Sequence, residues 1–249
     1  MYPIYALWSH PRSMSTAMER VMRERGDLDC AHEPFMYDYY VHRAVREMPH
    51  FDVQPDHPVS YIDIRNDLLR RAEAGPVFFK DMSYYVMPHL LEDAEFGAAL
   101  TNIFLIRDPQ AAIASYFKLD PEATLDEIGL EAQWAHYSAL RDRGKAPFVV
   151  RAEDVRQDTE GTMARLWQAV GLPFRSEAFN WQQEQPKDWV QVSGWHGNVN
   201  SSSGIRPLTA AEEREQQEKF DRMAEVHPKM REYLRHHRPF HERLSAVAI

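Results

Sequence analysis

Six residues near the start of the chain, Pro11-Arg12-Ser13-Met14-Ser15-Thr16, could bind a phosphate or sulfate group. They supply a guanidinium and three hydroxyl groups, all of which donate hydrogen bonds to anions. The apolar residues 4–7 before them predict a buried strand, and the amphipathic residues 16–25 after them predict a helix. A loop between a strand and a helix directs backbone N–H groups and the positive helix end at one point. The sequence therefore predicts an anion-binding loop.

This loop differs from the usual nucleoside-triphosphate loop, in which Gly and four residues precede Gly-Lys-Ser/Thr. Neither Gly nor Lys occurs between Trp8 and Thr16. We therefore expect no Mg-ATP or Mg-GTP site. A P-loop-type, nucleotide-dependent phosphotransferase is kept as an alternative function, because the order of strand, loop and helix is the same.

A second group of residues predicts a site for another phosphate. Residues 101–107 form an apolar run that ends in Arg107, which predicts a buried strand with a cation at its carboxyl end. Asp108 suits the N-cap of the next helix, and Pro109 suits its first position. Ser115 lies eight residues after Arg107, about two helical turns along. Arg107 and Ser115 could therefore hold one phosphate between them.

Together, the two motifs resemble those of the PAPS-dependent sulfotransferases, which transfer a sulfuryl group from 3′-phosphoadenylyl sulfate (PAPS) and release PAP. In that family a Pro-Lys/Arg-Ser-x-Ser/Thr-Thr loop holds the 5′-phosphosulfate, and an Arg, seven residues and a Ser hold the 3′-phosphate. The resemblance covers about residues 3–175, and its specific motifs lie at 9–16 and 107–115. Arg12 stands where many members have Lys, and Met14 where many have Gly. The resemblance implies these donor-binding residues: Arg12, Ser13, Met14, Ser15, Thr16, Arg107 and Ser115.

The resemblance also suggests catalytic residues. Many cytosolic members use a His in Lys-x-His as the base, but this chain has Lys80-Asp81-Met82. Other members use a Glu after the first helix, and His32-Glu33-Pro34-Phe35 resembles that arrangement. We therefore expect Glu33 to be the general base, Arg12 to stabilise the leaving phosphate and Lys80 to stabilise the transferring sulfuryl group. Glu33 could instead cap a helix or pair with an Arg. The alternative bases are Asp81, His10, His32, His89, His136 and His196.

Residues 184–207 predict a long irregular segment that contains Gly197, Ser202 and Arg206. Its position resembles that of the family's loop over the 3′-phosphate and adenine, so the resemblance implies that these three residues bind the donor. A disordered surface loop is the alternative.

Five tyrosines could line an acceptor pocket or pack in the core: Tyr37, Tyr39, Tyr40, Tyr84 and Tyr85.

Apolar runs alternate with amphipathic helical runs along the sequence, which predicts an α/β fold with a central parallel sheet and helices on both faces. The resemblance implies the P-loop NTPase-like sulfotransferase version of this fold. We predict strands at 4–7, 28–31, 77–80, 101–107 and 147–151, and helices at 16–25, 35–48, 62–74, 88–99, 109–119, 125–143 and 162–170. We expect a single domain over 1–249, with a core at 3–175, a donor-covering loop at 184–207 and C-terminal helices at 208–245.

The composition of the chain limits which binding partners and which cellular location we expect. The chain has 29 Lys and Arg against 38 Asp and Glu, and its net charge of −9 disfavours nucleic acid or an anionic membrane. Cys30 is the only cysteine, and no signal peptide or membrane span is apparent, so we expect a cytoplasmic location and no membrane partner.

The expected substrates are PAPS and a small-molecule or carbohydrate acceptor that offers a hydroxyl or, secondarily, an amine. We expect no metal requirement. A non-catalytic nucleotide-binding relative is a further alternative. The C-terminal helices could pack on the domain or join two copies as a homodimer.

Overall fold

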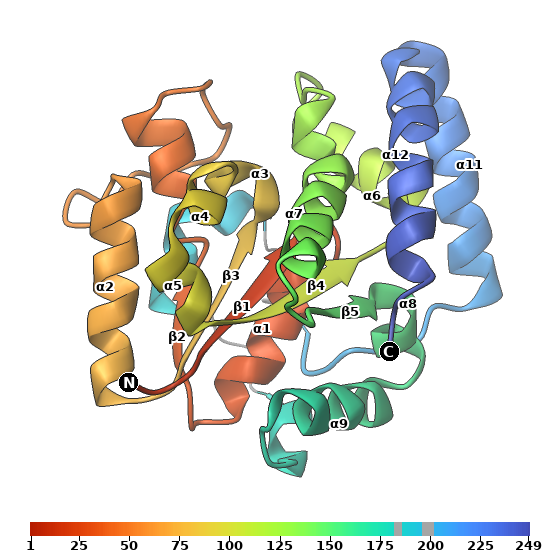
Figure 1. The fold of residues 1–249 in the computed structure, drawn as a ribbon. Helices are drawn as coiled ribbons and strands as arrows, with labels where there is room; N and C mark the ends of the chain where they lie inside the picture. The colour runs from red at the N-terminus through yellow and green to blue at the C-terminus, as the bar shows by residue number, and fades with distance from the viewer. Residues whose placement is uncertain (182–185, 196–201) are drawn as a thin grey trace.

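The computed structural model describes residues 1–181, 186–195 and 202–249. Five parallel strands form a sheet in the order β2-β3-β1-β4-β5 (Figure 1). The strands are β1 (Ile4–Ser9), β2 (Asp29–His32), β3 (Val77–Met82), β4 (Leu100–Ile106) and β5 (Phe148–Arg151). All five predicted strands are confirmed, with ends shifted by one or two residues. Because every strand runs in the same direction, their carboxyl ends lie along one edge.

The two faces of the sheet are both buried, as a parallel sheet requires. Along β1, Ile4, Ala6 and Trp8 belong to one apolar core, whereas Tyr5 and Leu7 belong to the other. This alternation follows from the two-residue side-chain period of a strand. The predicted architecture, a parallel sheet with helices on both faces, is therefore confirmed.

Different helices cover the two faces. The smaller core contains side chains of α1 (Ser15–Glu24), α9 (Thr159–Val170) and η3 (Ser176–Phe179). The larger core contains side chains of α2 (Tyr61–Ala74), α5 (Ala94–Ala99), α6 (Pro109–Phe117), α7 (Leu130–Asp142), α11 (Ala210–Val226) and α12 (Lys229–Ser245). In Figure 1, α11 and α12 stand side by side next to α6 and α7.

Capping residues set the starts of two helices, and one of these caps, Asp108, is predicted above from the sequence. Asp108 accepts the N–H of Ala111 at 3.1 Å, and Pro109 occupies the first turn of α6. Thr209 and Glu212 form a reciprocal capping box at the start of α11. These short-range signals explain why both helices begin where the sequence indicates.

Three predicted helices are shorter or divided. The 35–48 prediction holds only near η1 (Asp38–His42). Beyond it, Ala44 has a φ of 48°, and Arg46 forms ion pairs with Asp120 and Glu127. The 88–99 helix divides into α4 (His89–Glu92) and α5, where Asp93 caps α5. Gly129, with φ 83°, separates η2 (Asp126–Ile128) from α7.

Further short helices complete the chain: α3 (Ser83–Val86), α8 (Ala152–Gln157) and the 3₁₀ helix η4 (Lys187–Trp195). The last of these lies within the segment that we predict to be irregular, so that prediction is wrong for its first half. Among the described residues, no helix combines the length and the apolar character that crossing a membrane requires.

Candidate active site

The predicted anion-binding loop connects β1 to α1. Arg12 and Met14 have φ angles of 63° and 73°, so two non-glycine residues adopt the left-handed conformation. Glu33, after β2, also has a positive φ of 44°. All three line the same cavity, and backbone strain of this kind concentrates at functional sites.

The start of α1 lies open toward this cavity. Its N-cap residue, Met14, makes no side-chain capping hydrogen bond, and Ser15, Thr16 and Ala17 of the first turn line the cavity wall. First-turn N–H groups have no partner within a helix, and they carry its partial positive charge. Ser13 is fully buried, its hydroxyl has no hydrogen-bond partner among the described residues, and it does not line the cavity.

The cavity has a volume of about 620 Å³ and lies at the carboxyl edge of the sheet. Residues at or after the ends of all five strands contribute to its wall: Arg12, Glu33, Met82, Arg107 and Arg156. Ligand sites of open parallel sheets lie at this edge. The structure thus brings together both predicted phosphate motifs and the predicted base.

Within the described part of the chain, five cations and one carboxylate line the cavity, although the net charge of the chain is negative. The cations are Arg12, Arg107, Arg156, Arg206 and Lys219, and the carboxylate is Glu33. Such a concentration of positive charge is suited to a ligand with several negative charges.

Arg107 is half-buried, and it has no ion-pair partner among the described residues. Its guanidinium donates to the carbonyl of Arg12 at 2.8 Å and to Gln216 at 3.3 Å. Burial, followed by repulsion from Arg156, lowers the pKa of Arg107 to about 10. It therefore stays protonated at neutral pH, as an incompletely compensated cation.

Arg12 connects three parts of the site. Its Nε donates to Ser115 Oγ at 3.0 Å, and its Nη1 donates to the carbonyl of Trp195 at 2.7 Å. Burial lowers the pKa of Arg12, and the nearby Glu33 carboxylate partly opposes this effect. The contact with Ser115 joins the two motifs that are about ninety residues apart in the sequence.

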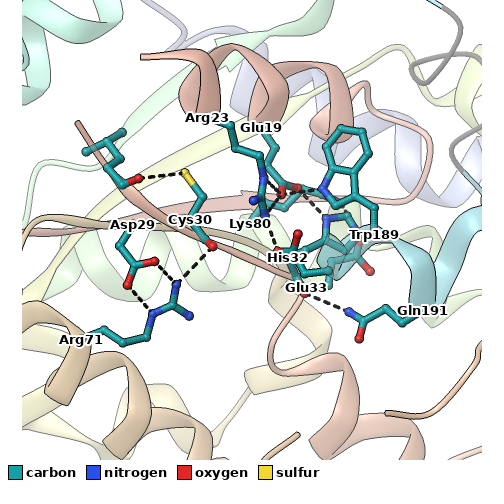
Figure 2. Close-up of polar contacts among 12 residues, drawn as sticks. Glu19, Arg23, Asp29, Cys30, His32, Glu33, Arg71, Lys80, Trp189 and Gln191 are labelled. Carbon is teal, nitrogen blue, oxygen red and sulfur yellow. Dashed lines mark hydrogen bonds and ion pairs between the residues drawn. The ribbon is translucent and has the colours of Figure 1, made fainter. Parts of the chain in front are cut away.

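Glu33 and Lys80 form a buried ion pair (Figure 2). The N–H of Glu33 also donates to the carbonyl of Lys80 at 3.0 Å. Glu33 lines the cavity, whereas Lys80 does not. The structure thus places Lys80 against Glu33 and away from the cavity wall.

The alternative bases lie elsewhere. Asp81 is fully buried and accepts the N–H groups of Phe35 at 2.7 Å and Met82 at 3.1 Å, and burial raises its pKa well above the usual value. His10, His32 and His136 are buried, and no histidine lines the cavity among the described residues. Figure 2 shows His32 directed toward Glu19, which also accepts from Trp189. His196 lies outside the described residues.

Aromatic and apolar side chains line the same cavity as Glu33. They are Met48, Met82, Tyr84, Tyr85, Tyr116, Val192 and Trp195. Of the five tyrosines considered above, Tyr84 and Tyr85 line the cavity. Tyr37, Tyr39 and Tyr40 pack in the larger core without lining it, which is the alternative that the sequence left open.

The late segment supplies further wall residues. Ser202 and Arg206, which we predict to bind the donor, line the cavity together with Gly204, Ile205 and Leu208. Arg206 is exposed and pairs with Glu212 at 2.5 Å. Gly197 lies outside the described residues.

Three polar wall residues have no counterpart in the sequence analysis: Arg156, Gln216 and Lys219. Arg156 follows the predicted strand at 147–151, so the rule that places sites at strand ends could have indicated it. Gln216 and Lys219 lie on α11, and only tertiary packing brings that helix to the site. The described residues contain no group of three or more His, Cys, Asp or Glu side chains arranged to hold a metal ion.

Residues 4–223 match a family model described as the sulfotransferase domain. The chain belongs to the sulfotransferase family. Two solved structures have a similar fold. The sulfotransferase domain from the curacin biosynthetic pathway has a TM-score of 0.54 and 13% identity, over 91% of this chain and 97% of that one. The sulfotransferase domain from the Synechococcus PCC 7002 olefin synthase has a TM-score of 0.51 and 17% identity, over 89% of this chain and 94% of that one.

Two curated plant proteins are also similar in sequence. Branched-chain-amino-acid aminotransferase-like protein 1 of Arabidopsis thaliana is 26% identical over 213 residues, which is 80% of this chain and 36% of that protein. The corresponding protein 2 is 24% identical over 213 residues, 80% of this chain and 35% of that protein. The chain thus spans little more than a third of the length of these relatives.

Proposed function

We propose that this sulfotransferase-family chain transfers a sulfuryl group from PAPS to the hydroxyl of a small acceptor, with Glu33 as the general base. The observation that carries the proposal is the composition of one cavity. Among the described residues, an anion-binding loop, five cations, the carboxylate of Glu33 and several aromatic side chains line it together. A polyanionic donor and an uncharged acceptor could therefore meet at Glu33.

The donor fits the charged part of the cavity. The first-turn N–H groups of α1 and the guanidinium of Arg12 would hold the 5′-phosphosulfate. Arg107 and Ser115 would hold the 3′-phosphate, with Ser202 and Arg206 of the late segment nearby. These residues donate hydrogen bonds, and the pKa of Arg107, about 10, keeps it charged.

The chemistry follows from the positions of Glu33 and Arg12. Glu33 would accept the proton of the acceptor hydroxyl as its oxygen forms a bond to sulfur. The bond from sulfur to the bridging phosphate oxygen would break, and the electron pair would remain on the phosphate of PAP. Arg12 would stabilise that charge as it develops. Cations and N–H groups supply the stabilisation, so this scheme requires no metal.

Lys80 would act through Glu33. Because it pairs with Glu33 and does not line the cavity, its contact supports orientation of the base. Direct stabilisation of the sulfuryl group would require Lys80 to leave that ion pair. The left-handed backbone of Glu33 and the N–H contact to Lys80 hold the carboxylate at the end of β2.

The acceptor would lie against the aromatic wall. Tyr84, Tyr85, Tyr116 and Trp195 present apolar ring surfaces that could stack on a sugar or an aromatic ring. A small metabolite or a carbohydrate with a free hydroxyl fits this wall, and an amine is the second choice.

The single cysteine agrees with function in a reducing compartment such as the cytoplasm.

Calorimetric titration with PAP, 5′-AMP and Mg-ATP tests the proposal. We expect micromolar or tighter binding of PAP and much weaker binding of AMP. Preference for Mg-ATP would instead favour a phosphotransferase. PAP binding together with unchanged sulfuryl transfer after replacement of Glu33 would contradict the role of Glu33 as the base.

A further inference from the structure

Arg156 is a cavity cation to which nothing in the sequence motifs assigns a role. It lies on α8, just beyond the end of β5. It forms no ion pair with any described residue, although arginines elsewhere, such as Arg43 and Arg71, pair with carboxylates. An arginine that faces a cavity without a carboxylate partner is suited to bind an anionic ligand.

The side chain of Met14 holds Arg156 in place. The sulfur of Met14 lies 3.3 Å from Nε and 3.1 Å from Nη2 of Arg156, and Nη1 lies 3.5 Å from the carbonyl of Arg206. A thioether is a weak acceptor, so these contacts orient the guanidinium without neutralising its charge. Met14 is also the residue that departs from the Gly found in many family members, so this contact is a feature of the present chain.

Arg107 and Arg156 stand at the junction of two cavities. A second cavity of about 480 Å³ adjoins the first, and both residues line both cavities. The second cavity contains neither Glu33 nor Arg12, nor any residue of the aromatic wall. A ligand group held between the two arginines would therefore lie away from the reacting centre.

The charges of this pair also indicate an anion. Repulsion from Arg156 is, after burial, the largest effect that lowers the pKa of Arg107. Burial and the nearby Arg206 likewise lower the pKa of Arg156. A phosphate between the two guanidinium groups would turn this repulsion into two attractions.

We propose that Arg156 binds the 3′-phosphate of the donor together with Arg107, and so determines the preference for a 3′-phosphorylated nucleotide. This inference rests on the proposed function and extends it to a residue outside the two motifs. It assigns to Met14 a side-chain role, the orientation of Arg156, in addition to its place in the loop.

The test compares PAP with 5′-AMP, which lacks the 3′-phosphate. Calorimetry gives both dissociation constants for the unchanged protein and for Arg156→Gln, Arg156→Lys and Arg165→Gln. Arg165 is the matched control, because it is an exposed arginine on α9 that lines neither cavity. Circular dichroism and the melting temperature verify that each variant is folded.

We expect Arg156→Gln to weaken PAP binding by about 10- to 100-fold, the range for one lost charge-assisted contact. Binding of AMP should stay near that of the unchanged protein. Arg156→Lys keeps the charge but lacks the planar guanidinium, so its PAP affinity should fall between those of the unchanged protein and Arg156→Gln. Arg165→Gln should change the affinity for neither nucleotide.

Two results would overturn the inference. If Arg156→Gln weakened the binding of PAP and AMP equally, Arg156 would contact a part of the nucleotide that both ligands contain. Unchanged PAP affinity in Arg156→Gln would remove it from the donor site altogether. A different result, in which the unchanged protein does not prefer PAP to AMP, would refute the proposed function itself.

Discussion

The backbone N–H of Arg107 donates to Nε2 of His10 at 3.1 Å. His10 follows β1, and Arg107 follows β4, so a neutral imidazole joins the ends of two adjacent strands. His10 precedes the loop that we expect to bind the 5′-phosphosulfate, and Arg107 is itself expected to bind the 3′-phosphate. The distance between the predicted phosphate sites is thus fixed in part by one histidine that must accept this hydrogen bond.

This requirement predicts a pH dependence of stability. Burial, followed by the nearby His241, Arg107 and His237, lowers the pKa of His10 to about 3, and burial lowers the pKa of His136 to about 3. The folded protein therefore binds fewer protons than the unfolded chain below the ordinary histidine pKa of about 6.5. Each histidine should remove about 1.4 kcal/mol of unfolding free energy per pH unit as the pH falls from about 6.5 toward 3.

Urea unfolding between pH 7.5 and 4.5 checks this expectation. His10→Gln keeps an acceptor near the position of Nε2 but cannot be protonated in this range. Its unfolding free energy should depend less steeply on pH than that of the unchanged protein, and its PAP affinity should be retained. Parallel pH profiles for the two proteins would contradict the buried neutral state of His10.

Arg107→Ala should weaken PAP binding by about 2–3 kcal/mol, because a charge-assisted contact with a phosphate is lost. Arg141→Ala on α7 is a suitable control, since that arginine is exposed and lines neither cavity. Calorimetric titration of both variants with PAP gives the comparison. A dissociation constant for Arg107→Ala that equals the control value would count against the predicted 3′-phosphate site.

Glu33→Gln should lower kcat by about 10²- to 10⁴-fold, the usual contribution of a general base. Its PAP affinity should change little, because Glu33 belongs to the acceptor side of the cavity. Glu177→Gln, at an exposed carboxyl that pairs with Arg175 and lines neither cavity, serves as the control. Since Lys80 loses its charged partner, the melting temperature of Glu33→Gln must be measured beside its activity.

Sulfuryl transfer should continue in EDTA, because cations and N–H groups of the chain itself perform the electrostatic stabilisation in the proposed mechanism. The assay follows conversion of PAPS to PAP before and after dialysis against the chelator. Complete loss of activity, with recovery on addition of a divalent ion, would show that the mechanism omits a metal.

The sequence predicts the fold well because its signals are local. Apolar runs locate the five strands, and the capping residues Asp108, Thr209 and Glu212 locate two helix starts. Predictions are wrong where tertiary contacts decide the conformation. After His42 the chain leaves the helix, and Arg46 there pairs with Asp120 and Glu127 from distant parts of the sequence, which no local pattern reveals.

The sequence also predicts part of the candidate site. Arg12, Arg107 and Ser115 share a cavity because the carboxyl ends of parallel strands meet at one edge. The ion pair between Glu33 and Lys80 depends on the register of β2 and β3, in which His32 lies opposite Lys80. That register cannot be obtained from the two short segments alone.

Arg12 and Met14 hold a left-handed backbone conformation in a loop that has no glycine. Side chains at both positions limit the conformations of the loop more than glycine would. The loop therefore has its shape before any nucleotide arrives, and it loses little further backbone entropy on binding. Association with an anionic nucleotide should then be limited by diffusion and electrostatic attraction, and its rate should fall as ionic strength rises.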